Sequence, residues 1–106
     1  MAEPVLTSDR IRAFADLSHD HNPLHVDEAV AARSPFGSIV AHGFLLLGHP
    51  LIALAGQVDY PKTLECRFLL PGRPGDEVAT EVEADGSFTV RIRGQAAVVG
   101  RVSAGE

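Results

Sequence analysis

The residues whose chemistry stands out are the histidines and their polar neighbours in one turn region. All five histidines lie within residues 19–49. Asp20, His21, Asn22 and His25 fall in a single short segment that contains an Asn-Pro step. A carboxylate and an imidazole five positions apart across such a turn can converge on one small molecule, such as a water. Asp20 and His25 are therefore a candidate acid/base pair.

Two other interpretations of this segment stay open. Local spacing alone favours an Asx-turn with a structural histidine over catalysis at Asp20 and His25. A metal site could instead draw on His19, Asp20, His21 and His25. However, alternating residues of an extended loop point to opposite sides, and no His-x-x-x-His pair is expected within one helix here. We therefore expect no metal and no other cofactor.

Helices are predicted on both sides of this turn. Hydroxyls at residues 7 and 8 can cap a helix whose apolar residues follow at helical spacing and which should end near residue 18. The Asn22-Pro23 step predicts a turn, because proline disfavours helical backbone in the residue before it. Asp27 can then cap a short helix over residues 28–33.

A third helix is predicted from about residue 41 to residue 55. Apolar residues lie on nearly all of its sides, which is typical of a buried helix. Pro50 should kink it, because proline removes one backbone hydrogen bond, and Gly56 is a natural end. His42 and His49 resemble ordinary packing or surface residues, and the sequence assigns them no role.

The second half of the chain changes to a period of two. Strands are expected over residues 63–70, 77–84, 88–93 and 96–102. In the first of these, the side chains expected to face the core are Leu64, Cys66, Phe68 and Leu70. Alternation of this kind indicates an antiparallel sheet with one covered face.

The pleat predicts the register of the middle hairpin. A two-residue Asp85-Gly86 loop would place a polar residue opposite an apolar one, which mixes the two faces of the sheet. A three-residue loop, 85–87, pairs Val82 with Val90 and Glu81 with Arg91, so that an ion pair can form across the strands. We expect the three-residue loop.

Length and composition limit the architecture. The chain has 106 residues, 45% of them hydrophobic and 22% charged, which suits one globular domain and not a disordered segment. One buried helix followed by a sheet with a single apolar face predicts an α+β fold in which the antiparallel sheet wraps around the helix. Residues 1–106 are expected to form that single domain.

Charge and composition also exclude several classes of protein. Nine Lys and Arg against fourteen Asp and Glu give a net charge of −5, and no basic run occurs, so a nucleic-acid partner is not expected. The single cysteine, Cys66, excludes an intramolecular disulfide framework. The longest apolar stretch, residues 40–55, is interrupted and shorter than the roughly 20 residues of a membrane span. With no signal-peptide pattern at the start, we expect a cytoplasmic protein without membrane contact.

Residues 14–48 resemble the signature of the MaoC-like dehydratases, which include the (R)-specific enoyl-CoA hydratases. The matching elements are Asp20-x-Asn22-Pro23-x-His25 and, about 17 residues later, the Ala41-His42-Gly43 segment. Weaker similarity extends through residues 57–102. Members of this family adopt the hot-dog fold, in which a sheet wraps a long helix, and the resemblance implies that fold here. Few residues precede the first helix, so the family's first strand is expected to be short or missing.

The resemblance implies roles for four residues. Asp20 and His25 match the catalytic pair that holds and activates one water, which adds across the double bond of a trans-2-enoyl thioester to give a (3R)-hydroxyacyl thioester. Gly43 matches the residue whose backbone N–H binds the thioester oxygen, and a helix N-terminus suits that task because its N–H groups are unpaired. Asn22 is expected to support the turn or the pair.

The resemblance also sets the expected partners and the alternatives. The substrate would be a thioester of coenzyme A or of acyl carrier protein, and a homodimer is expected, with a heterodimer as the other possibility. A non-catalytic thioester-binding or heterodimer-supporting subunit on the same fold is the main alternative function. An acyl-CoA thioesterase is a further one, against which the Asn22-Pro23-x-His25 turn argues.

Overall fold

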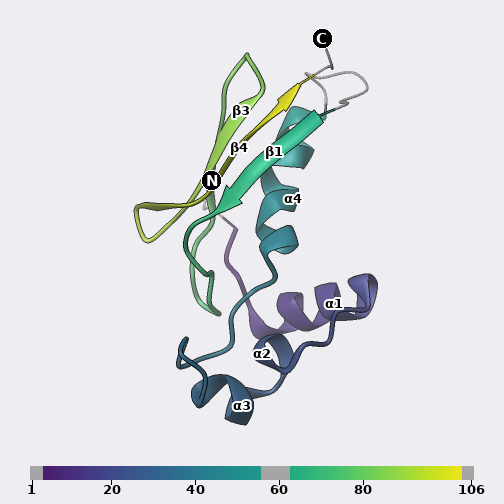
Figure 1. Cartoon of the computed structure of the whole chain (residues 1–106), viewed down its shortest axis with the longest axis vertical. Helices are drawn as coiled ribbons and strands as arrows, with labels where there is room; N and C mark the ends of the chain where they lie inside the picture. Colours follow the sequence, from purple (N-terminus) through teal and green to yellow (C-terminus); the bar gives the residue numbers. More distant parts are fainter. Residues whose placement is uncertain (1–3, 56–62, 104–106) are drawn as a thin grey trace.

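The structure, a computed structural model, describes residues 4–55 and 63–103 (Figure 1). Four helices come first, and four strands follow. They are α1 (Ser8–Ser18), α2 (Pro23–Val26), α3 (Glu28–Ala32), α4 (Gly43–Leu54), β1 (Thr63–Phe68), β2 (Ala79–Val82), β3 (Ser87–Ile92) and β4 (Gln95–Ser103). This order agrees with the predicted change from helical to strand periodicity.

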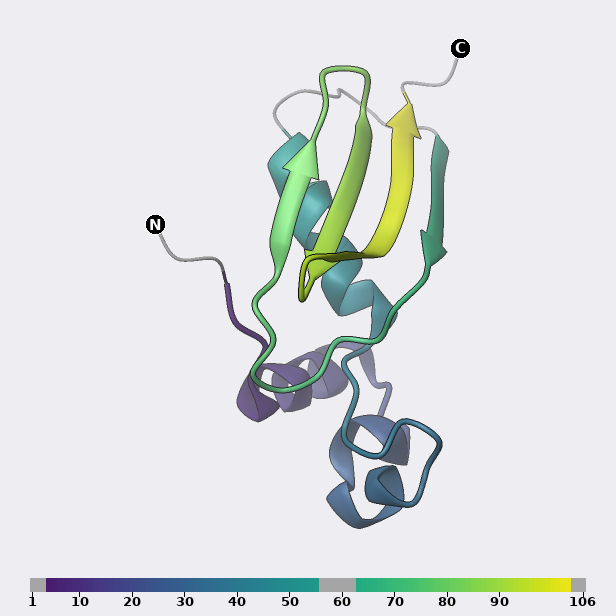
Figure 2. The same ribbon diagram turned by 90° about the vertical axis from the view of Figure 1, so that its left-hand side faces the viewer.

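The strands form one antiparallel sheet in the order β1-β4-β3-β2. Figure 2 shows the sheet face-on with α4 crossing behind it, while α1, α2 and α3 lie beyond one end of the sheet. The expected α+β architecture, an antiparallel sheet laid over a long helix, is confirmed. In line with the expected short first strand, the described residues before α1 form an isolated bridge, from Val5 to Glu77, and no strand.

The first three helices begin at capping side chains. Thr7 Oγ1 accepts from the Arg10 N–H at 3.1 Å, and Asp27 Oδ1 accepts from the Val30 N–H at 3.1 Å. The turn predicted at Asn22-Pro23 is one helical turn, α2, because proline is tolerated at the first position of a helix. These caps fix where each short helix starts and so hold the turn between α1 and α3.

Helix α4 differs from its prediction at its start and on its surface. It begins at Gly43, with His42 as the N-cap residue, and not at residue 41. One side packs on the sheet, but Phe44 is 70% exposed and Ile52 is 80% exposed, so the helix is not buried all round. The sheet covers only one side of the helix, which explains the exposed face. Gly56, the expected end, lies outside the described residues.

No described helix is long and apolar enough to cross a bilayer.

The core lies between α4 and the inner face of the sheet. Val90, Ile92 and Val98 of the sheet, and Val78 just before β2, are fully shielded from solvent. Strand β1 does not follow the predicted pattern, because Leu64 and Phe68 are about half exposed instead of buried. This strand is an edge of the sheet among the described residues, and α4 makes its main contacts with the other three strands.

The β2–β3 hairpin also corrects the sequence prediction. Val82 pairs with Phe88 and Glu81 pairs with Thr89, so the register differs by two residues from the predicted one. The loop has three residues, as expected, but they are residues 84–86, because Gly86 adopts a positive φ of 91° that closes the turn. A shift of two preserves the faces of the sheet. The expected ion pair still forms, diagonally, between Arg91 Nε and Glu81 Oε2 at 3.0 Å.

Candidate active site

Asp20 and His25 are brought together at the junction of α1 and α2. His25 Nδ1 donates to the Val40 carbonyl at 2.7 Å, since a carbonyl can only accept. The other ring nitrogen, Nε2, is then unprotonated in the neutral ring and lies 4.0 Å from Asp20 Oδ2. The His25 side chain is 15% exposed and that of Asp20 is 55% exposed, so the pair lies at the surface with the imidazole set deeper.

The separation of 4.0 Å is too long for a direct hydrogen bond but suits a shared water. Two hydrogen bonds of about 2.8 Å that meet at about 90° span this distance. One water can therefore donate to the carboxylate and to the free ring nitrogen at the same time. This is an arrangement able to activate a water by general base catalysis.

Asn22 supports the turn, and none of its hydrogen bonds within the described residues reaches the ring of His25. Its side-chain oxygen accepts from the Leu24 N–H at 3.0 Å, which caps α2. Its own N–H donates to Asp20 Oδ1 at 3.3 Å. Asn22 thus links the carboxylate of Asp20 to the start of the helix that carries His25.

Gly43 is the first residue of α4, where helix N–H groups have no partner within the helix. It also lines an apolar pocket of about 340 Å³. The other lining residues are Phe36, Leu46, Phe68, Leu69, Leu70 and Pro71. A methyl group on Gly43 would lie 2.8 Å from the ring of Phe68, so any larger residue here requires that ring to move. An oxyanion that docks on the Gly43 N–H would therefore have an apolar wall beside it.

His42, to which the sequence assigned no role, is part of the same cluster. It is 3% exposed, and its ring stacks on that of His25 with centroids 3.8 Å apart and an interplanar angle of 24°. Its Nε2 donates to the Asp20 carbonyl at 3.0 Å. The sequence held one signal for this role, because His42 stands directly before Gly43 in an apolar run. A polar residue that is buried there needs a hydrogen-bond partner.

The geometry of this cluster does not suit a metal ion. Asp20, His25 and His42 offer ligand atoms within 4.8 Å of one another. An imidazole binds a metal in the plane of its ring at about 2.0–2.1 Å. The two ring planes are nearly parallel and their centroids are 3.8 Å apart, so one ion cannot lie in both without a ring turning. The other candidates are not part of this cluster. His19 is the C-cap residue of α1, in a left-handed conformation, and His21 contacts Asp16 at 2.9 Å.

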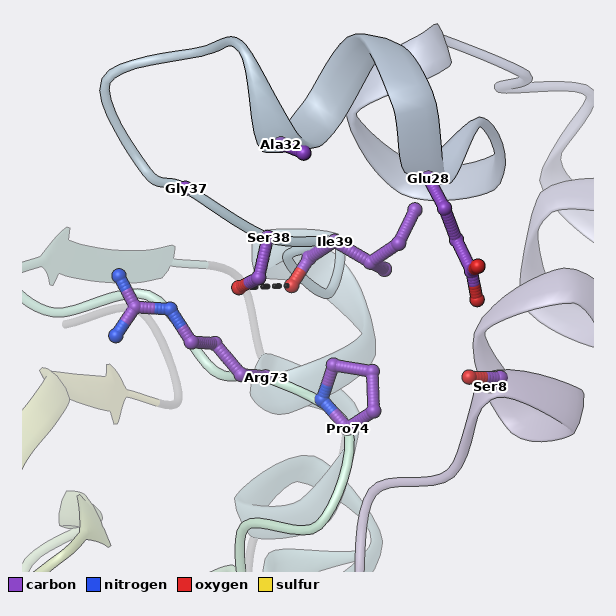
Figure 3. Close-up of a pocket in the computed structure, with 8 residues that line it drawn as sticks. All are labelled: Ser8, Glu28, Ala32, Gly37, Ser38, Ile39, Arg73 and Pro74. Atoms are coloured by element: carbon purple, nitrogen blue, oxygen red, sulfur yellow. Dashed lines mark hydrogen bonds between the residues drawn. The ribbon is translucent and has the colours of Figure 1, made fainter.

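A second pocket, of about 420 Å³, lies between the start of α1, α3 and the loops around residues 37–39 and 73–74 (Figure 3). Its lining residues are Ser8, Glu28, Ala32, Gly37, Ser38, Ile39, Arg73 and Pro74. In Figure 3 the Glu28 carboxylate points toward Ser8, and the Arg73 guanidinium lies on the other side of the pocket near Ser38. Glu28 and Arg73 therefore both line this pocket, with the Arg73 guanidinium donating to the Phe36 carbonyl at 3.0 Å. None of the predicted site residues lines it.

A sheet laid over a central helix, with an Asp–His pair beside the helix N-terminus, defines an α+β domain of the hot-dog class. The chain belongs to the MaoC like domain family, whose model matches residues 2–105. The family expected from the signature in residues 14–48 is thereby confirmed.

Individual relatives agree with this assignment. The chain is 42% identical over 80 residues to the (R)-specific enoyl-CoA hydratase of Aeromonas caviae. This match covers 69% of this chain and 58% of that protein. It is 34% identical over 82 residues to the 3-hydroxybutyryl-CoA dehydratase of Methylorubrum extorquens. This match covers 74% of this chain and 52% of that protein. The chain thus spans little more than half the length of these curated relatives.

A solved structure confirms the fold. The (R)-hydratase from A. caviae involved in PHA biosynthesis superimposes with a TM-score of 0.80 and 29% identity. The match covers 94% of this chain and 87% of that one. The hot-dog arrangement expected from the sequence therefore holds for nearly the whole chain.

Proposed function

We propose that this protein is a lyase that hydrates trans-2-enoyl thioesters to (3R)-hydroxyacyl thioesters, or runs the reverse dehydration. The proposal rests on one observation: Asp20 Oδ2 lies 4.0 Å from His25 Nε2. The other ring nitrogen of His25 is hydrogen-bonded to the Val40 carbonyl. The names of the relatives from A. caviae and M. extorquens support the same reaction class.

In the proposed reaction, one water lies between Asp20 and His25. His25 Nε2 takes one proton of the water as its oxygen bonds to C3 of the substrate. The electron pair of the C2=C3 bond moves toward the thioester carbonyl and gives an enolate. The imidazolium then returns the proton to C2, so that the elements of one water are added and nothing else is consumed. Asp20 orients the water and stabilises the imidazolium.

Gly43 would act on the other half of the substrate. Its backbone N–H at the start of α4 can donate to the thioester oxygen as negative charge develops there, and the helix dipole favours that charge. The apolar pocket beside Gly43 supports an uncharged acyl or thioester segment in that position. The thioester activates its own double bond, so the proposal includes no cofactor.

Replacing Asp20 with asparagine tests the proposal. The change keeps the size of the side chain and removes its charge, and we expect kcat for crotonyl-CoA hydration to fall at least about 100-fold. Asp16 gives a matched control, because its carboxylate also faces a histidine, His21 Nε2, at 2.9 Å but on the exposed surface of the same region. Asp16→Asn should leave kcat within about twofold, with circular dichroism unchanged in both variants.

The other outcomes select the alternative functions. If the wild-type chain hydrates no enoyl thioester but binds one, a thioester-binding subunit is the better account. Release of free thiol from an acyl-CoA would favour a thioesterase. Equal hydration by wild type and Asp20→Asn would remove Asp20 from the reaction.

We also propose that the functional unit is a dimer of this chain. Apolar side chains on α4 and β1 are exposed in the single chain, among them Phe44, Ile52, Leu64 and Phe68. Edge strand β1 lies beside them, and an exposed edge of a sheet can pair with a second copy. Sedimentation equilibrium would test this. A stable monomer would contradict it, and assembly only after a second polypeptide is added would favour the heterodimer.

The proposal extends to the organisation and location of the chain. Residues 1–106 would form one domain, because helices and strands share the core between α4 and the sheet. We propose a cytoplasmic location, with which a single cysteine is compatible. Limited proteolysis and cell fractionation test these two points.

A further inference from the structure

The starting point is an unusual residue at the N-cap of α4. The N-cap position favours Ser, Thr, Asp and Asn, whose side chains accept from the first N–H groups of the helix. His42 holds this position and makes no such bond, although it is buried. Its Nδ1 is also buried and has no hydrogen-bond partner among the described residues. Local helix stability therefore does not explain the histidine.

The contacts of His42 point to the catalytic pair. Nε2 donates to the backbone carbonyl of Asp20, 22 residues away in the chain. The ring stacks on that of His25, and it makes an edge-type contact with the Phe14 ring at a centroid distance of 4.9 Å. The side chain thus contacts both members of the pair, while its backbone begins the helix that presents Gly43.

We infer that His42 is a positioning residue for the hydration, and this inference rests on the proposed function. Its Nε2–H fixes the Asp20 carbonyl and with it the turn that carries the carboxylate. Its ring supports the plane of His25, whose Nδ1 is already tied to the Val40 carbonyl. Together these contacts set the 4.0 Å separation between Asp20 Oδ2 and His25 Nε2. His42 does not need to touch the substrate or the water.

Two variants separate the donor from the packing. His42→Gln keeps an N–H donor at nearly the place of Nε2, whereas His42→Phe keeps a ring but has no donor. We expect His42→Phe to lower kcat for crotonyl-CoA about 10- to 100-fold with KM within about threefold, since a misplacement near 1 Å can cost about that much. His42→Gln should stay within about threefold of wild type. His49→Gln and His49→Phe, on the same helix but outside the cluster, are matched controls that should leave kcat unchanged.

A second measurement does not depend on turnover. The ring ¹⁵N chemical shifts of His25 report which nitrogen carries the proton and what surrounds it. They should move in His42→Gln, which removes the ring stacked on His25, and change less in His42→Phe, which keeps a ring there. Circular dichroism and Tm exclude unfolded variants.

The results distinguish the two proposals. If His42→Phe is as active as wild type, or His42→Gln loses as much activity as His42→Phe while still folded, the positioning role is refuted. If the wild-type chain hydrates no enoyl thioester, the proposed function fails. The His25 ring ¹⁵N shifts then decide whether His42 positions His25. A change in the His25 shifts in His42→Gln that is smaller in His42→Phe then supports the positioning of His25 alone, and unchanged shifts in His42→Gln refute it.

Discussion

Replacing Gly43 with alanine tests whether substrate must approach the start of α4 closely. The new Cβ would lie 2.8 and 2.9 Å from two ring carbons of Phe68. Carbon atoms in contact prefer about 3.5–4.0 Å, so the ring must move by about 0.7 Å or more. Phe68 is 50% exposed and can turn outward, which makes this movement inexpensive.

Gly43→Ala is expected to have a small effect on stability and a large effect on kcat. Crowding of this kind costs about 1–3 kcal/mol, and alanine is favoured over glycine in a helix by about 1 kcal/mol. The free energy of unfolding should therefore fall by no more than about 2 kcal/mol. The methyl group also stands beside the N–H that is proposed to bind the thioester oxygen. Loss of one such donor costs about 10²- to 10³-fold in kcat, and we expect a loss of about 100-fold.

The assay is crotonyl-CoA hydration by Gly43→Ala, Phe68→Ala and the double variant, with urea unfolding of each. If the loss comes from obstruction of the N–H, Gly43→Ala should reduce kcat by the same factor with or without the Phe68 ring. Recovery in the double variant would assign the defect to the displaced ring. A Gly43→Ala enzyme within about threefold of wild type would refute the oxyanion role of Gly43.

Two further predictions concern stability. Gly86→Ala should lower the free energy of unfolding by at least about 3 kcal/mol, because Gly86 has a φ of 91° and its Cβ would collide with the Val102 carbonyl. Gly94→Ala, at a φ of 74° with no neighbour within 4 Å, should lose only about 1–2 kcal/mol, and equal losses in urea unfolding would contradict the steric argument. Burial, and secondarily the charge of Arg10, lower the pKa of His49 below its ordinary value of 6.5. The unfolded chain therefore binds more protons below about pH 6.5, and the contribution of His49 to stability falls as the pH drops through that value. His49→Leu should show a smaller loss between pH 7.5 and 5.5, and an unchanged loss would show that His49 is not the source.

Local sequence signals predicted the elements well because the forces that set them are local. Thr7 and Asp27 cap the helices that their hydroxyl and carboxylate indicated. Alternation identified the buried side chains of β3, among which Val90 and Ile92 are fully shielded. The hairpin register was wrong by two residues because alternation has a period of two and cannot distinguish such a shift. The left-handed backbone at Gly86 decided it.

The sequence could not show which predicted faces have something packed on them. Alternation along β1 marked Leu64 and Phe68 as core residues, and apolar residues on all sides marked α4 as buried. In the single chain, the sheet covers one side of α4, and β1 lies at an edge. Burial depends on which elements meet, and this information is not contained in the pattern of any one of them.

For the candidate site, the sequence by itself determined the chemistry that is present: a carboxylate, an imidazole and a helix start, in an order typical of MaoC-like dehydratases. Only the tertiary structure decided their relations. It set 4.0 Å between Asp20 and His25, directed one ring nitrogen of His25 to Val40, and brought His42 from 22 residues away onto Asp20. Hydrogen bonds and ring stacking act over a few ångströms in space, whatever the separation along the chain. For that reason a residue type and its spacing predicted the reacting groups, while the residue that positions them was found only in the folded chain.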